Sequence, residues 1–169
     1  MRLSIGLPLI IAGTAVVMDL RTARVENEWI LFSLAVSFVW RVWQEGINGA
    51  FDFLMGALLP VLILGVLFYF RMLGPGDIKL FCALGGVMGP AAIGKCILSS
   101  FFLGAIISLA ILIFCGSFIS RIHYLICYFQ NLLHTGKIVP YYRKGMVLEN
   151  FHFTVPVFMS VMLYAGGVY

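Results

Sequence analysis

Six apolar segments make up most of this chain, and they constrain its fold more than any other feature of the sequence. A helix needs about 20 apolar residues to cross the hydrocarbon core of a membrane, with a usual range of roughly 17–25. Six segments reach or approach that length: 3–18, 29–43, 50–70, 78–93, 97–120 and 151–169. Charged residues make up 11% of the chain, whereas about a quarter of an average soluble protein is charged. We therefore expect an all-α, polytopic membrane protein with six transmembrane helices, folded as a single domain over residues 1–169.

Two connections between these segments need separate interpretation. The first segment also resembles a cleavable signal peptide, but five further apolar segments follow it, so we expect it to be retained. Before the last segment, the apolar residues at positions 122, 125, 126, 129, 132 and 133 fall on one face of a helix. We expect an interfacial amphipathic helix in the last cytoplasmic loop. The other interpretation is a lid or substrate-docking element.

The distribution of basic residues predicts how the chain is oriented. Cytoplasmic loops of membrane proteins carry an excess of Lys and Arg. If the amino terminus is outside, eight of the eleven basic residues lie in or beside the inside connections: Arg21, Arg24, Arg71, Lys79, Arg121, Lys137, Arg143 and Lys144. This orientation puts Asp19 and Asp77 together at the cytoplasmic face. The net charge of +4 therefore indicates orientation in a membrane, and we expect no nucleic-acid partner.

Asp19 and Asp77 are the strongest candidates for chemistry. Each lies at the end of an apolar segment, and an ionisable group near hydrocarbon is costly enough to suggest a function. Two neighbouring carboxyl groups can share a proton, so that one activates water while the other polarises a carbonyl group. The same pair could instead form a proton or cation site in a small transporter or channel. Spacing alone does not separate these two functions.

The residues around Asp77 favour a site that accepts a peptide backbone. Gly74 and Gly76 can adopt positive φ and allow close approach, and Pro75 stiffens the turn. Lys79 either biases the carboxyl pair toward ionisation or anchors to lipid headgroups. Asn27 is predicted to cap the second helix, and it is also a candidate for the active-site loop.

The helix ends suggest how the two acids divide the work. Asp77 begins a helix, where the dipole favours a negative charge, and Asp19 ends one, where the dipole disfavours it. We therefore predict that the shared proton resides mainly on Asp19 and that Asp77 is the base. The histidines (His123, His134 and His152) show no ligand spacing, so we expect neither a metal site nor another cofactor.

Two motifs carry a resemblance to a known family. The first runs from Asp19 to Asn27, as Asp-Leu-Arg-Thr-Ala-Arg-Val-Glu-Asn, and the second reads Gly-Pro-Gly-Asp-Ile-Lys-Leu over residues 74–80. Together they resemble the type IV prepilin peptidase family, whose pattern is an aspartate, then Ile-Pro-Asn, then Gly-x-Gly-Asp-x-Lys-Leu. Residues 153–158 are similar to the closing proline-containing helix of that family. The resemblance extends over essentially the whole chain.

This resemblance implies a six-helix intramembrane aspartyl protease of a bacterial or archaeal cytoplasmic membrane. Such an enzyme cleaves the basic leader of prepilin-like membrane proteins after a glycine, at the cytoplasmic face, with Asp19 and Asp77 as the catalytic pair. Prepilin-like proteins and membrane lipid are then its partners. The family's long members add an amino-terminal extension with paired cysteines, and many methylate the new amino terminus. This chain resembles the short, protease-only branch.

Glu26 stands where the family pattern has proline, which predicts a looser connection after Asp19. Presenilin and signal-peptide-peptidase chains share the Gly-x-Gly-Asp motif, but they are longer and have a tyrosine before the first aspartate. Met18 occupies that position here.

Overall fold

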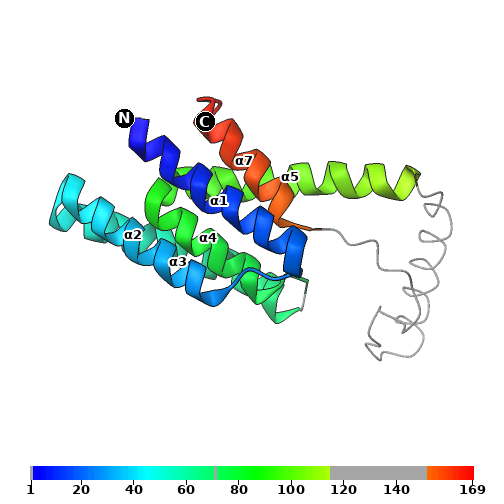
Figure 1. The fold of residues 1–169 in the computed structure, drawn as a ribbon, viewed down its shortest axis with the longest axis horizontal. Helices are drawn as coiled ribbons and strands as arrows, with labels where there is room; N and C mark the ends of the chain where they lie inside the picture. The colour runs from blue at the N-terminus through cyan, green and yellow to red at the C-terminus, as the bar shows by residue number, and fades with distance from the viewer. Residues whose placement is uncertain (1, 71, 115–151) are drawn as a thin grey trace. The chain divides into compact units, whose positions relative to one another are not determined.

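The structure, a computed structural model, describes residues 2–70, 72–114 and 152–169 (Figure 1). These residues form helices and no strands, which confirms the all-α prediction. The helices are α1 (Arg2–Thr22), α2 (Asn27–Glu45), α3 (Ile47–Tyr69), α4 (Pro75–Met88), α5 (Pro90–Phe114) and α7 (Thr154–Ala165).

Three of these helices are long and apolar enough to cross a membrane. The candidate spans are Ile5–Thr22 in α1, Ile47–Tyr69 in α3 and Pro90–Phe114 in α5. The prediction of six transmembrane helices is thus supported for three segments and stays a prediction for the others. The predicted interfacial helix at 122–133 lies outside the described residues.

The exposed surfaces of the long helices are themselves apolar. On α3, Leu62 is 77% exposed, and on α5, Leu98 is 73% exposed and Phe102 is 69% exposed. Water would penalise exposed apolar area by roughly 25 cal/mol per Å², whereas lipid would not. These surfaces therefore fit a hydrocarbon environment.

Glycine and proline set the helix boundaries near both ends of α4. Pro75 occupies the first turn of α4, where its missing N–H group costs no helical hydrogen bond. At the other end, Gly89 has a φ of +84° and Pro90 follows at once as the first residue of α5. A positive φ is easily adopted only by glycine, so the chain can reverse direction within one residue.

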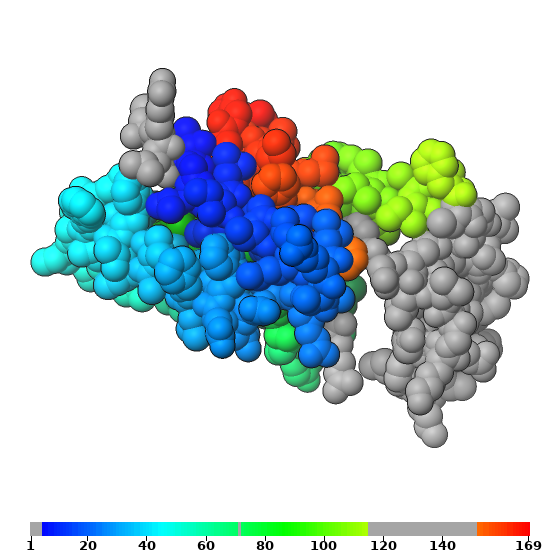
Figure 2. Space-filling model, in the orientation of Figure 1, coloured from blue at the N-terminus to red at the C-terminus, as the bar shows by residue number. Residues whose placement is uncertain are grey.

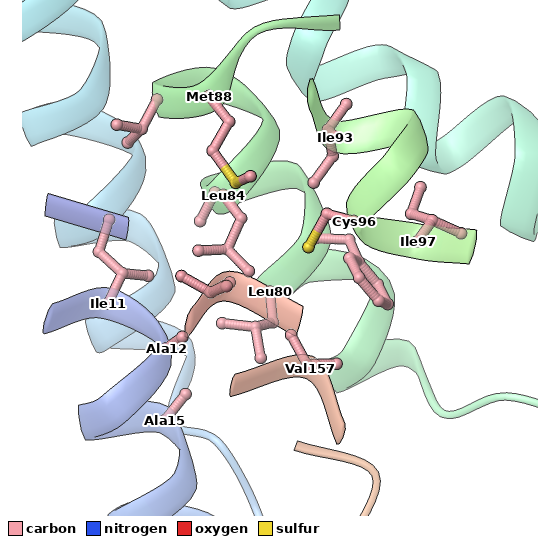
Figure 3. Packing of buried hydrophobic residues seen from close by; sticks show 14 of the residues in the cluster. Ile11, Ala12, Ala15, Leu80, Leu84, Met88, Ile93, Cys96, Ile97 and Val157 are labelled. Atoms are coloured by element: carbon pink, nitrogen blue, oxygen red, sulfur yellow. The ribbon is translucent and has the colours of Figure 1, made fainter. Parts of the chain in front are cut away.

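The core is built around α4, which contacts α1, α2 and α3. Its side chains from Leu80 to Met88 are almost all buried, and Leu80, Leu84 and Met88 belong to a cluster with residues of α1, α5 and α7 (Figure 3). A helix of 14 residues is about 21 Å long, shorter than the roughly 30 Å hydrocarbon core. Because protein surrounds α4, it does not need the length of a lipid-exposed span.

The small residues Ala12 and Ala15 of α1 are fully buried in the same cluster, together with Val157 and Val161 of α7. This packing holds α1 and α7 against each other, and the space-filling view shows their surfaces adjoining (Figure 2). Residues more than 130 positions apart in the sequence therefore become neighbours at the carboxyl end of α1.

The chain divides into two compact units, Met1–Gly104 with His152–Tyr169, and Ala105–Phe151. All of the candidate site residues described below belong to the first unit. The prediction of one domain over residues 1–169 stays a prediction.

Candidate active site

Asp19 and Asp77 line the same cavity, which has a volume of about 450 Å³. The other residues predicted from the sequence to belong to the site also line it: Asn27, Gly74, Gly76 and Lys79. Arg24 and Thr154 contribute to its wall as well. The structure therefore brings the two sequence motifs together, although 58 positions separate Asp19 from Asp77.

Each aspartate sits at a helix end, as the sequence predicts. Asp19 lies in the last turn of α1, and Asp77 lies in the first turn of α4. Helix α1 contacts α4, and the carboxyl end of α1 and the amino end of α4 meet at the cavity. Only this packing of helices places the two carboxyl groups at one site.

Asp77 has an environment that favours its protonated form. The pKa of Asp77 is raised to about 6, mainly by burial and also by the nearby charge of Asp19, while a hydrogen bond with the backbone of Gly74 acts in the opposite direction. Desolvation and a like charge both oppose ionisation of a carboxyl group. Here they outweigh the favourable position of Asp77 at a helix amino terminus.

Asp19 is held by the side chains of Thr154, the first residue of α7, and His152, two residues before it. The hydroxyl group of Thr154 donates a hydrogen bond to Oδ2 of Asp19 at 2.7 Å. Nδ1 of His152 lies 3.2 Å from the same oxygen. Donors of this kind match a carboxylate, which only accepts hydrogen bonds.

These surroundings favour the reverse of the proton assignment made from helix ends. That assignment put the proton on Asp19 and made Asp77 the base. The contacts instead supply donors to Asp19 and bury Asp77. The helix dipole acts on both groups, but burial and direct hydrogen bonds are stronger than the roughly 0.3–1 kcal/mol of an exposed dipole interaction.

Thr154 and His152 are site residues that sequence reasoning missed. His152 was considered only as a metal ligand, and Thr154 only as part of the closing helix. A polar pair at the start of an apolar segment was the available signal. Among the described residues, no group of three or more His, Cys, Asp or Glu side chains could hold a metal ion, and His123 and His134 lie outside them.

Asn27 does not cap α2, so that prediction is wrong. Glu26 is the N-cap residue, and no side-chain hydrogen bond caps this end. The Asn27 side chain instead accepts a hydrogen bond at 2.8 Å from Nζ of Lys79. This bond connects the beginnings of α2 and α4 at the edge of the cavity.

Glu26 keeps a backbone conformation that proline could also adopt. Its φ is −66° and its ψ is 137°, and proline fixes φ near −65°. A proline here, as in the pattern that the sequence resembles, could therefore adopt the same backbone conformation. The expected loosening is not visible in its dihedral angles.

The two glycines of the second motif do not have positive φ, contrary to the expectation, so what matters at these positions is the missing side chain. Gly74 has a φ of −74°, and Gly76 is not among the glycines with positive φ in the described residues. A Cβ atom on Gly74 would lie 3.2 Å from Oδ2 of Asp77, whereas one on Gly76 would meet nothing within 4 Å. The space beside Gly76, the residue before Asp77, is therefore open.

Comparison with known proteins gives one match. The model of the type IV leader peptidase family matches residues 7–114, a stretch that contains both aspartates and the Gly-Pro-Gly-Asp motif. No curated protein and no solved structure matches the chain.

Proposed function

The chain belongs to the type IV leader peptidase family, and from this premise we propose that it is an aspartic endopeptidase. Its substrates are prepilin-like membrane proteins, and it removes their short basic leader after a glycine at the cytoplasmic membrane face. The observation that carries this proposal is the shared cavity of Asp19 and Asp77, two acids from separate helices.

The proposed chemistry needs one ionised and one protonated carboxyl group. The ionised carboxyl takes a proton from water as the water oxygen attacks the scissile carbonyl carbon, and the protonated one gives its proton to the carbonyl oxygen. The tetrahedral diol then collapses. The leaving amine receives the proton taken from water, and a diol hydroxyl returns a proton to the second carboxyl, so no metal or cofactor is consumed or required.

A second cavity supports the proposed substrate class. It has a volume of about 690 Å³, and it shares Gly74 and Pro75 with the cavity of the aspartates. Its remaining lining is mainly apolar and comes from the end of α3 and the residues that follow: Gly65, Phe68, Tyr69, Met72 and Leu73. We propose that the apolar helix of the substrate begins here, while its basic leader extends into the cavity that contains the carboxyl groups.

An ion-translocating function is the alternative that the sequence left open. Membership of a peptidase family does not favour it. Open space beside Gly76 also suits an extended peptide better than an ion, because an ion needs a closed shell of ligands.

Cleavage of a prepilin-like protein by the purified full-length chain in lipid tests the proposal. We expect mass spectrometry to detect cleavage after the leader glycine. Asp19→Asn and Asp77→Asn should each lower the rate by roughly a thousandfold or more, as removal of a principal catalytic group does. Asp52→Asn is the matched control, since Asp52 is half-exposed, lies outside the cavity lining and pairs with Arg41 at 3.9 Å.

Two outcomes contradict the proposal. One is a folded wild type that cleaves none of several prepilin-like substrates. The other is an Asp19→Asn or Asp77→Asn variant that is as active as Asp52→Asn.

A further inference from the structure

Two side chains from one short stretch converge on a single oxygen of Asp19. Thr154 Oγ1 and His152 Nδ1 both approach Oδ2, at 2.7 Å and 3.2 Å. Thr154 is the first residue of α7 and His152 lies two residues before it, 135 and 133 positions away from Asp19 in the sequence. The contact is well shielded, because Thr154 is 2% exposed and the side chain of Asp19 is 15% exposed.

The hydroxyl group of Thr154 is used differently from those of Thr14 and Ser100, which also lie in helices. Thr14 and Ser100 donate to backbone carbonyl oxygens one turn earlier in their own helices. Such bonds satisfy a hydroxyl locally. Thr154 stands at the first position of α7, where no preceding helical turn offers a carbonyl, and it donates to Asp19. The helix boundary therefore directs this donor into the site.

The same geometry determines which nitrogen of His152 carries a hydrogen. An ionised carboxylate accepts hydrogen bonds and cannot donate them. Nδ1 must therefore be the protonated nitrogen whenever Asp19 is ionised. Both contacts engage Oδ2 and neither occupies Oδ1, the oxygen that can then receive a proton from water.

We infer that Thr154 and His152 are positioning residues that hold Oδ2 of Asp19, so that Asp19 acts as the carboxylate base and Asp77 as the protonated acid. This inference rests on the proposed peptidase function. The other charged groups that line the cavity are Lys79 of α4 and Arg24 after α1, and Lys79 already donates to Asn27. Thr154 and His152 thus provide the direct contacts that distinguish the environment of Asp19 from that of Asp77.

The test compares removal of each donor with its conservative replacement in the purified full-length enzyme. Thr154→Val removes the hydroxyl while keeping the shape, and Thr154→Ser keeps a hydroxyl. His152→Leu removes the ring nitrogen, and His152→Asn places a neutral amide donor near the position of Nδ1. Cleavage of the same substrate by the wild type is measured first. If the wild type does not cleave, the proposed peptidase function is refuted, and the variants are not needed to show it.

We expect Thr154→Val and His152→Leu to lower kcat by roughly 10- to 100-fold each, the range for losing a hydrogen bond to a charged group, with KM nearly unchanged. The acidic limb of the kcat/KM profile should also move to higher pH, since a carboxylate without its donors is protonated more easily. Thr154→Ser and His152→Asn should recover most of kcat. A merely structural contact would lower the fraction of folded enzyme but would not move the pH profile.

The inference is overturned if the donor-free variants keep kcat within twofold of the wild type, or if they change only KM. It is also overturned if kcat falls while the acidic limb stays in place. If Thr154→Val does not fold, Thr154→Ser, His152→Leu and His152→Asn provide the same test. If kcat of His152→Asn is then no higher than kcat of His152→Leu, the role of Nδ1 is contradicted.

Discussion

Asp77 illustrates how two opposing effects act on one residue. Its place in the first turn of α4 favours a negative charge through the helix dipole. Burial and the charge of Asp19 oppose that charge and raise the pKa of Asp77 to about 6. The second effect is larger because a desolvated carboxylate loses hydration that a few helix amides do not replace.

This raised pKa predicts a pH dependence of stability. The folded state holds the Asp77 proton more tightly than the unfolded state, whose pKa is near 3.8. The extra stability is therefore complete below about pH 4 and is lost as the pH rises through about 6. The side chain in Asp77→Asn is never charged. Between pH 4 and pH 7, the free energy of unfolding of this variant should therefore rise relative to that of the wild type by up to about 3 kcal/mol.

Unfolding in a neutral detergent, measured across this pH range for both proteins, provides the check. Asparagine keeps an oxygen that can accept the hydrogen bond from Gly74, so the substitution changes mainly the charge. A stability difference that is constant from pH 4 to pH 8 would refute the prediction.

Sequence reasoning identified Asp19 and Asp77 because carboxyl groups at the ends of apolar segments are conspicuous. It did not identify Thr154, because a threonine at the start of an apolar helix is ordinary and its acceptor lies 135 positions away. Asn27 shows the opposite error. A local capping pattern predicted its role, but its side chain instead accepts a long-range hydrogen bond from Lys79.

The contact between α3 and α4 depends on two glycines. Gly56 of α3 and Gly85 of α4 are each buried, and a Cβ atom on either would collide with the backbone carbonyl oxygen of the other. The two backbones therefore touch directly. Small residues permit this close approach between membrane helices, and the position of Asp77 depends on it because Asp77 lies on the same helix as Gly85.

Gly85→Ala should force α3 and α4 apart. We expect the free energy of unfolding to fall by roughly 1–3 kcal/mol, the usual cost of overpacking, although alanine is the better helix former. Gly65→Ala is the control on α3, since a Cβ atom there would meet nothing within 4 Å; it should be neutral or stabilising by up to about 1 kcal/mol. Denaturation of both variants in detergent measures the difference, and equal stabilities would show that the close contact is unimportant.

The helices α1 to α4 run in alternating directions (Figure 1), so the end of α1 and the start of α4 lie at the same end of these helices. The connections after α1 and before α4 both border the cavity of the aspartates. At the other end, Arg41 of α2 lies against Gly89, the residue that follows α4. The same arginine pairs with Glu45 at 3.1 Å. Asp19 and Asp77 therefore lie at one end of these helices, and Arg41, Glu45 and Gly89 lie at the opposite end.

The excess of basic residues in the connections expected to lie inside predicts an orientation in the membrane. We predict that Arg24 faces the cytoplasm and that Glu45 faces the other side. In a chain whose native cysteines are replaced by serine, Arg24→Cys should react with a membrane-impermeant maleimide in inside-out vesicles, and Glu45→Cys in right-side-out vesicles. Both side chains are exposed, so accessibility to the reagent depends on the side of the membrane. The reverse pattern, or labelling of both from one side, would contradict the predicted orientation.

The sequence by itself determined the class of this protein. The length of the apolar segments predicts helices in lipid, and the distribution of basic residues predicts an orientation. The two aspartate motifs indicate the family. All of these properties depend on residue type and short spacing alone. The tertiary structure decided the surroundings of each acid. The convergence of Thr154 and His152 on Asp19, the burial of Asp77 and the backbone contact of Gly56 with Gly85 all join distant segments. No local pattern encodes such contacts, since they arise only when α1, α3, α4 and α7 pack together.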